Sequence, residues 1–209
     1  MQRNHQVHLS TQLNSYDLLK QTAFHEAGHA AAIYIGNQNR GLPQVFFQIA
    51  ISENPCLAHI NGGQLIQNLP VASLEYLKCL NAEAKIDQEA AYQADIVNIL
   101  VGPLAEAKYV AIRDNEPLNN KLLNFASLVH YGGRSDLEKA STYLEYFVPD
   151  IGSRDLIMLE LFKQAYAFID NRIYWTCILN LAHFILDSQQ ATISCEEAIS
   201  VLDEFLLCC

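Results

Sequence analysis

The chain reads Thr22-Ala23-Phe24-His25-Glu26-Ala27-Gly28-His29-Ala30-Ala31-Ala32 over residues 22–32, a stretch that predicts one helix. Two histidines separated by four positions stand on the same helical face, one turn apart. Both imidazoles can then reach one metal ion, and Glu26 lies beside the position that the ion leaves open. This is the spacing that a metalloprotease needs for two zinc ligands and a general base. The motif therefore predicts a zinc site at His25 and His29, with Glu26 as the base.

The helix that carries this motif is expected to extend well beyond it on both sides. Ser15 is a suitable N-cap, and Asp17 lies in the first turn, where an acidic side chain suits the helix dipole. The helix is expected to run to about Ile35 and to stop at Gly36-Asn37. Gly28 inside it costs about 1 kcal/mol relative to alanine, which a close neighbour would explain. That neighbour is either another helix or the metal site.

Residues 38–70 change character and favour β-structure. Residues 45–51 are rich in β-formers, and residues 57–60 and 63–66 could add one or two short strands. An edge strand near the metal helix would hold a peptide by its main chain without selecting its side chains. The same pattern is equally compatible with a small structural hairpin.

From Ser73 onward the pattern is helical almost to the C-terminus. Ser135 with Glu138 predicts a capping box, and the residues from Ser194 onward cap a final helix. A kink or break is expected at Gly102-Pro103. The predicted helices cover residues 73–80, 84–112, 118–129, 135 onward, 154–186 and 194–207. Because no repeat, low-complexity segment or convincing linker divides the chain, we expect one mainly α-helical domain over residues 1–209, with residues 1–14 as a polar lead-in.

The composition of the 209 residues favours a well-packed globular protein, with 51% hydrophobic and 17% charged residues. The formal net charge of −10 would repel phosphate backbones, so we expect no nucleic-acid partner. The polar N-terminal residues lack the apolar core of a secretion signal, and the apolar runs are too short to span a bilayer. These features predict a soluble, cytoplasmic protein without a membrane partner.

The chain has six cysteines, with no CxxC pair and no dense framework, which predicts reduced, buried or incidental thiols. The terminal Cys208-Cys209 pair is compatible with lipidation, although an exposed or packed pair is the simpler interpretation.

A catalytic zinc site has a third protein ligand, and Asp136 is the first candidate. The Gly132-Gly133 loop gives the backbone freedom, and the predicted capping box fixes where the next helix begins. The helix dipole keeps a carboxylate ionised at that position, as a ligand must be. The alternative is that Asp136 is an ordinary residue of a helix start.

Other residues compete for roles at the site. Glu83 with Asp87 forms an ExxxD pattern that is typical of thermolysin-like enzymes. Glu106 and Asp95 are expected to orient a ligand histidine or to be solvated helix charges. Cys56 with His59 could form a thiolate-containing site, although their flanking proline and glycines favour a turn. His130, close to Asp136, could polarise a substrate carbonyl or be an ordinary loop histidine.

Several segments together resemble the peptidase domain of the FtsH-type zinc metalloprotease family. Residues 22–35 resemble that family's metal-binding helix, and residues 132–141 resemble the motif that contains its aspartate ligand. Between them, Asp95-Ile96-Val97 with Gly102, Ala105 and Glu106 is similar to the helix that leads into a Gly-Gly-Arg-Ala-Ala-Glu-Glu segment. Residues 175–205 look like the closing helices of the family. The resemblance covers about residues 15–205.

The resemblance implies a mostly helical, zincin-like peptidase domain with a small edge-strand element near the metal helix. It implies zinc held by His25, His29 and Asp136, with Glu26 as the base. The chain departs from the family at Val101, Pro103, Leu104 and Ser135, and it contains neither a GxxxxGK[ST] motif nor membrane segments. Because it lacks the ATPase module that this motif marks, the chain is not expected to unfold stable substrates.

These features predict a zinc-dependent peptidase that hydrolyses peptides or unfolded proteins without ATP. The related proteases form rings, so a homo-oligomer is compatible with the resemblance. The alternative is a non-proteolytic binding or adaptor module that retains the peptidase fold. The intact His25-Glu26-Ala27-Gly28-His29 motif argues against that alternative, because a protein that only binds does not need Glu26.

Overall fold

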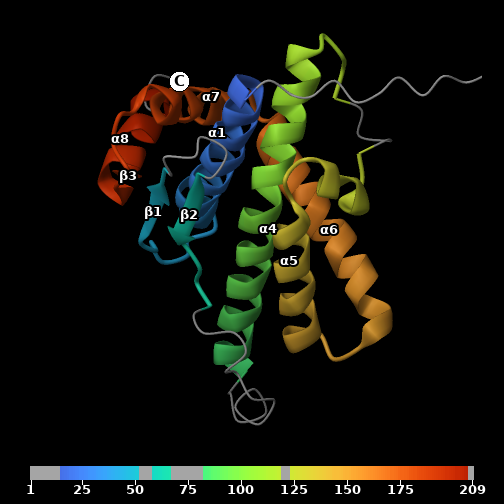
Figure 1. The fold of residues 1–209 in the computed structure, drawn as a ribbon. Helices are drawn as coiled ribbons and strands as arrows, with labels where there is room; N and C mark the ends of the chain where they lie inside the picture. Colours follow the sequence, from blue (N-terminus) through green and yellow to red (C-terminus); the bar gives the residue numbers. More distant parts are fainter. Residues whose placement is uncertain (1–14, 52–57, 67–81, 119–122, 207–209) are drawn as a thin grey trace, which may run out of the picture.

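The computed structural model describes residues 15–51, 58–66, 82–118 and 123–206, which form helices and one small antiparallel sheet (Figure 1). The α-helices are α1 (Ser15–Ala31), α2 (Asn37–Asn39), α4 (Ala82–Arg113), α5 (Arg134–Phe147), α6 (Ile151–Asp170), α7 (Arg172–Asp187) and α8 (Cys195–Leu206). A π-helical segment, η1 (Ala32–Gly36), joins α1 to α2, and a 3-10 helix, η2 (Phe125–His130), precedes α5. The expectation of a mainly α-helical chain with a small β-element is confirmed.

The first helical segment continues past the predicted stop at Gly36-Asn37, so that prediction is wrong. After η1 it makes one further α-turn, and the left-handed residue that follows is Gly41, with φ of +66°. Gly36 serves a close contact instead, because a Cβ there would lie 3.3 Å from the Arg40 guanidinium and 3.5 Å from the Asn98 side chain. Asn37 is buried, with its side chain 3.0 Å from that of Asn98.

Helices α1 and α4 form the most extensive contact between any two elements in the described residues. A Cβ at Gly28 would lie 2.7 Å from the Cβ of Ala105, so the close neighbour that Gly28 requires is another helix. Of the kink or break predicted at Gly102-Pro103, the break is absent, because α4 continues through these residues. Proline in a helix removes one backbone hydrogen bond. Full burial of the apolar side chains around it offsets that loss, notably those of Leu100, Val101 and Leu104.

The sheet has the strand order β2-β1-β3, with β1 (Phe47–Ala50) antiparallel to β2 (His59–Gly62) and to β3 (Thr192–Ile193). The predicted hairpin is thus present, whereas β3, from the far end of the chain, was not predicted. Phe47 and Ile49 point into the core, and Ile49 lies opposite Ile60 of β2 and Ile193 of β3. Strand β2 is an edge of this sheet and contacts α1.

Two predicted helix starts differ from the structure. In the helix expected over residues 118–129, residues 119–122 lie outside the described residues and residues 125–129 belong to η2, where a capping box joins Asn124 and Ser127. Helix α5 begins at Arg134 with Gly133 as its N-cap, so the capping box predicted for Ser135 and Glu138 is absent.

The capping box at the last helix does form. The backbone N–H of Ser194 donates to Glu197 Oε2 at 2.8 Å, and the N–H of Glu197 donates to Ser194 Oγ at 3.2 Å.

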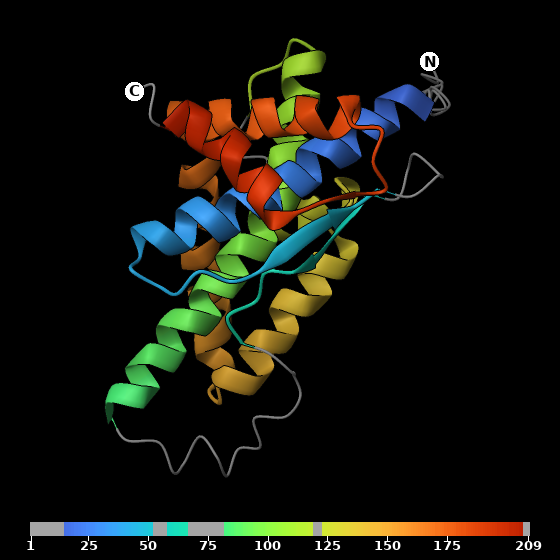
Figure 2. The same ribbon diagram turned by 90° about the vertical axis from the view of Figure 1, so that its left-hand side faces the viewer.

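Helix α4 is the central element of the arrangement (Figures 1 and 2). Helices α5 and α6 pack along one side of it, and α1 crosses it with the sheet on α1's outer side. Helix α7 packs against α1, α6 and α8. None of the described helices is long and apolar enough to cross a membrane. The helix predicted over residues 73–80, the polar lead-in, Cys56 and the Cys208-Cys209 pair lie outside the described residues.

Candidate metal centre

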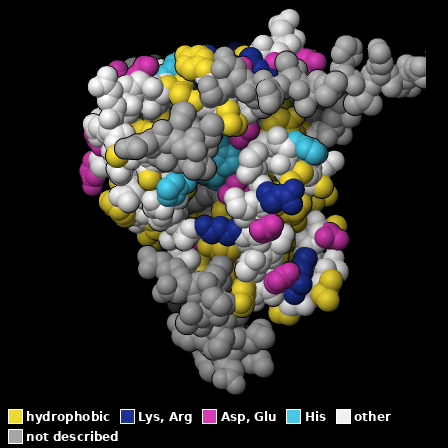
Figure 3. Space-filling model, viewed as in Figure 1, with side chains coloured by type: hydrophobic (Ala, Val, Ile, Leu, Met, Phe, Trp, Pro, Cys, Tyr) yellow, Lys and Arg dark blue, Asp and Glu magenta, His cyan; other side chains and the backbone are white. Residues whose placement is uncertain are grey.

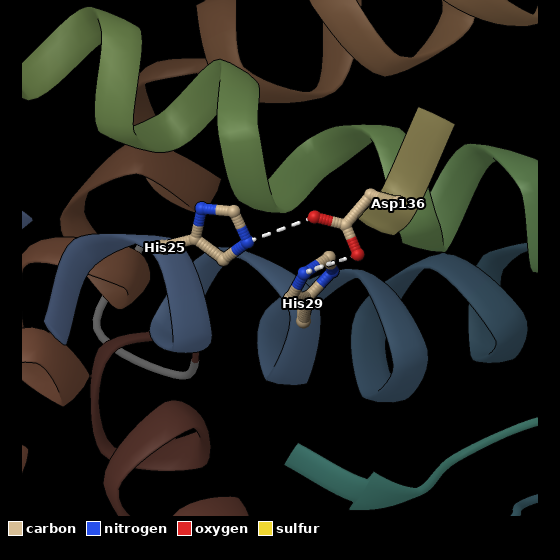
Figure 4. Close-up of side chains that lie close together, drawn as sticks. All are labelled: His25, His29 and Asp136. Carbon is tan, nitrogen blue, oxygen red and sulfur yellow. Dashed lines mark hydrogen bonds and ion pairs between the residues drawn. The ribbon is translucent and has the colours of Figure 1, made fainter. Parts of the chain in front are cut away.

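His25, His29 and Asp136 converge at the crossing of α1, α4 and α5 (Figure 4). His25 Nε2 lies 3.1 Å from Asp136 Oδ2, and His29 Nε2 lies 3.6 Å from Asp136 Oδ1. One ligand atom from each of the three residues lies within 4.8 Å of the others. The helical spacing and the distant aspartate therefore meet at one point, although 111 residues separate His25 from Asp136.

This geometry suits a tetrahedral metal ion. With metal–ligand bonds of about 2.0–2.1 Å, two ligand atoms on tetrahedral zinc lie about 3.3 Å apart. The separations of 3.1 Å and 3.6 Å bracket this value. Two imidazoles and a carboxylate are also a donor set that zinc accepts. The three ligand atoms as a group lie within 4.8 Å of one another, so the side chains would close in around a bound ion.

Helix α4 fixes the orientation of both imidazoles from behind. His25 Nδ1 lies 3.0 Å from Glu106 Oε2, and His29 Nδ1 lies 2.9 Å from the backbone carbonyl oxygen of Asn98. Each Nδ1 donates to its acceptor, which leaves both Nε2 atoms to face Asp136. Glu106 thus takes one of the two roles expected of it, that of orienting a ligand histidine.

One stripe of α4 faces the site, and Asn98 and Glu106 within it make these contacts. It comprises Asp95, Asn98, Gly102 and Glu106, at spacings of three and four residues that place them on one helical face. Gly102 provides room, because a Cβ at this position would lie 2.3 Å from His29 Nε2. The absence of a side chain at Gly102 is therefore what allows His29 to stand between α1 and α4.

A second glycine completes the site from the loop before α5. Gly132 has φ of +68°, and a Cβ there would lie 2.8 Å from Glu106 Oε2 and 3.2 Å from His25 Nδ1. Only glycine combines this left-handed backbone with so close an approach. Gly132 thereby lets the chain turn into α5 close enough to present Asp136 to the histidines.

Glu26 is buried beside the two histidines, with 7% of its surface exposed. Its carboxylate accepts a hydrogen bond from the backbone N–H of Ile60 in strand β2. Its buried Oε2 has no hydrogen-bond partner among the described residues. Burial raises the pKa of Glu26, while the neighbouring histidines lower it in part. An unpartnered buried carboxylate oxygen is costly, which indicates that a polar ligand belongs there.

The charges of the three candidate ligands are strongly coupled. Burial lowers the pKa of His25, but hydrogen bonds to Asp136 and Glu106 outweigh it and raise that pKa to about 10. Burial would raise the pKa of Asp136, but both histidines hold it well below its usual range. A proton on the imidazole thus fills the role of a cation between the side chains, and a bound metal would replace it.

The candidate ligands open into a cavity of about 470 Å³. One part of its lining comes from residues 58–60 and 62–64 of β2 and its flanks, and another from Ser135, Asp136 and Lys139 of α5. Figure 3 shows histidine and acidic side chains gathered near the middle of this face, with basic side chains close by. The cavity is large enough to admit a peptide segment to the metal centre.

Two of the competing residues, Asp87 and His130, are not brought to this centre. Asp87 is exposed and lies 15 residues before Gly102 on α4, about 22 Å away along the helix axis, and Glu83 precedes it by another turn. His130 is exposed and is absent from the cavity lining. His59 does line the cavity, from β2.

Asp95 does not orient either histidine, which corrects one expectation. Its carboxylate accepts hydrogen bonds from the backbone N–H groups of residues 65 and 66 instead.

Comparison of the chain with known protein families, curated proteins and solved structures finds no match.

Sequence reasoning did not identify the carbonyl of Asn98 or the space at Gly102 and Gly132 as parts of this site. A backbone carbonyl gives no sequence signal, since every residue has one. Gly102 and Gly132 did give a signal, because each lies four residues before a candidate site residue, Glu106 and Asp136 respectively. Their contact partners depend on how α1 and α4 cross.

Proposed function

We propose that this chain is a zinc-dependent metallopeptidase with a zincin-like helical domain, similar to the peptidase domain of FtsH-type proteases. The observation that carries this proposal is the convergence of His25, His29 and Asp136 beside the buried carboxylate of Glu26, whose Oε2 has no hydrogen-bond partner among the described residues. Two imidazoles, one carboxylate and a free acidic group are the set that metal-assisted hydrolysis requires.

The chain's own residues divide the chemistry between them. Zinc, when bound by His25, His29 and Asp136, supplies a Lewis acid that brings the pKa of a bound water to about 7. Glu26 accepts the proton of the attacking water and passes it to the leaving amine. Its raised pKa suits this exchange, because a base that works near neutral pH must hold a proton briefly. Glu106 and the Asn98 carbonyl keep the two imidazoles in place.

The substrate that fits this site is an extended peptide. Edge strand β2 lines the cavity and its Ile60 N–H reaches Glu26, so a peptide paired with β2 would lie beside the base. Main-chain pairing favours unfolded proteins and peptides over folded ones. Hydrolysis needs no ATP in this scheme.

The test is hydrolysis of unfolded casein and of peptides by the zinc-loaded protein, with and without a chelator. Glu26→Gln should lower the rate at least about thousandfold while leaving the zinc content unchanged, because the base is lost and the ligands remain. Asp136→Asn should lower the zinc affinity. Asp114→Asn, an exposed carboxylate paired with Arg113 at the end of α4, is the matched control.

Two results would contradict the proposal. Full hydrolysis by a purified Glu26→Gln protein would exclude Glu26 as the base. Peptide binding without any hydrolysis by the zinc-loaded wild type would favour the non-proteolytic adaptor instead.

A further inference from the structure

Asp95 is a buried carboxylate that the proposed chemistry does not use. Only 1% of its surface is exposed, and three donors surround it. The backbone N–H of Leu65 donates to Oδ1 and that of Ile66 to Oδ2, both at 2.9 Å. The hydroxyl of Tyr143 donates to Oδ2 at 2.9 Å. Hydrogen bonds to an ionised group are about twice as strong as neutral ones, so this cluster resists separation.

These three donors come from opposite sides of the cavity. Leu65 and Ile66 continue the chain directly from the β2 side, whose residues 58–60 and 62–64 line the cavity. Tyr143 lies on α5, seven residues after Asp136 on the same helix. Figure 1 shows α4 between β2 and α5. Asp95, on α4, is therefore hydrogen-bonded to both sides of the cavity.

We propose that Asp95 is a positioning residue that sets the width of the substrate cleft between β2 and α5. The inference rests on the proposed function, since it assigns a role in holding an extended peptide. With its carboxylate in place, the segment after β2 and the helix that carries Asp136 keep a fixed separation. Without it, the β2 side loses its tether to α4 while the metal ligands stay where they are.

The position along α4 predicts which part of a substrate depends on this tether. Asp95 precedes Gly102 by seven residues, which is about 10 Å along the helix axis. An extended peptide advances about 3.3 Å per residue, so this distance corresponds to about three substrate residues. Asp95 should therefore affect long peptides and leave the shortest ones unaffected.

The experiment compares the full-length, zinc-loaded wild type with Asp95→Ala on fluorogenic peptides of about three and about ten residues. We expect the KM of Asp95→Ala for the long peptide to rise about tenfold, with kcat, zinc content and the KM for the short peptide unchanged. Amide exchange of Leu65 and Ile66 should accelerate at least about tenfold, because both N–H groups lose their acceptor. Glu89→Gln, an exposed carboxylate on the same helix, is the control.

Tyr143→Phe provides a second test that keeps the ring in the core. It removes only the link to α5, so we expect about a threefold rise in KM for the long peptide and unchanged amide exchange at Leu65 and Ile66. Equal rises in KM for short and long peptides, or wild-type amide exchange in Asp95→Ala, would overturn the inference.

Failure of the proposed function gives a different pattern. If the zinc-loaded wild type hydrolyses no peptide, the Kd for the long peptide replaces KM as the measure of the cleft. An unchanged Kd in Asp95→Ala would then overturn the inference on its own, and a tenfold weaker one would support it.

Discussion

Two faces of helix α1 use different physical interactions, although they belong to the same turns. The site face comprises His25, Glu26 and His29, and the nitrogen atoms of the two histidines meet defined partners on α4 and α5. The aromatic face centres on Phe24, which stacks on Tyr109 at a centroid distance of 4.3 Å and on Trp175 at 5.7 Å. The first depends on the placement of single atoms, and the second on the area that it buries.

This difference predicts that the proposed zinc binding and the stability of the fold depend on different residues of α1. The site face includes buried polar groups, and burial of such a group destabilises the folded state unless the group is hydrogen-bonded. Glu26 Oε2 lacks a partner among the described residues. The aromatic face buries large rings that gain from apolar contact and stacking. We therefore expect substitutions on the aromatic face to change stability without changing zinc affinity. Substitutions around the site should change zinc affinity, and they should change stability only through the charges and hydrogen bonds that they remove.

The largest expected effect is that of Phe24→Ala. Phe24 is 2% exposed, and its truncation removes the stacking contacts with Tyr109 and Trp175 and leaves a cavity. The free energy of unfolding should fall by about 3 to 5 kcal/mol, measured by urea denaturation. Zinc affinity at low temperature should match the wild type. Ile112→Ala, at an exposed position beside the same aromatic groups, is the control and should change little.

The pH dependence of the metal-free protein is the next effect in size. The hydrogen bonds to Asp136 and Glu106 raise the pKa of His25 to about 10 against the lowering by burial. A raised pKa means that the folded state holds the proton more tightly than the unfolded state. The stabilisation is therefore complete below about pH 6.5 and is lost as the pH rises towards 10.

We expect this loss to be on the order of 3 kcal/mol, measured by urea denaturation in the presence of a chelator. Zinc should abolish the decline, because a metal-bound imidazole carries no proton at Nε2. His25→Gln should remove the decline as well. His183→Gln, whose ring lies edge-on to Phe24 on the aromatic face, should retain it. A decline that persists in His25→Gln would show that another group causes it.

The sequence predicted which side chains gather at the candidate site better than it predicted the path of the backbone around them. His25, Glu26 and His29 lie on one helix, so their relative placement follows from the 3.6-residue period alone. Asp136 lies 111 residues from His25. It was selected from the glycine loop and the predicted helix start around it, and the resemblance of that segment supported the choice. The structure brings these side chains together, while their chemistry remains a prediction.

Local signals failed where tertiary packing overrides them. Gly36 and Gly102 look like helix breakers, but each makes room for a neighbouring side chain inside a continuous helical segment. The capping box expected with Ser135 as its N-cap is absent because α5 already begins at Arg134, with Gly133 as its N-cap. Strand β3 has only two residues, too few for a periodic pattern, and its pairing with β1 follows from the fold.

Glu106→Gln tests the site face without changing its shape. Glutamine retains an oxygen that can accept from His25 Nδ1, but it removes the negative charge behind the imidazole. We expect zinc affinity to fall tenfold to hundredfold, about 1.4 to 2.7 kcal/mol, measured by competition with a coloured chelator. Unchanged affinity would mean that the carboxylate only fills space. Asp114→Asn, an exposed carboxylate at the end of the same helix, should bind zinc as the wild type does.

The smallest expected effect, that of Lys108→Met, tests the boundary between the two faces. Lys108 lies two residues after Glu106 on α4 but points to the aromatic side, where its Nζ lies 4.5 Å from the centroid of the Trp175 ring. It also donates to the carbonyl oxygen of Ile169, at 2.6 Å. Methionine preserves the length and apolar packing of the stem and removes the charge. The free energy of unfolding should therefore fall by only about 1 kcal/mol, which corresponds to about 2–4 °C in Tm.

Zinc affinity decides what this small loss means. If it is unchanged, the two faces are independent even at adjacent turns of α4, because the charge of Lys108 acts on α6 and α7 alone. If zinc affinity falls together with stability, the aromatic face contributes to the placement of Glu106, and the proposed separation of the two faces is wrong. Lys20→Met is the matched control, since Lys20 lies over the exposed ring of Tyr16 at the start of α1, remote from Glu106.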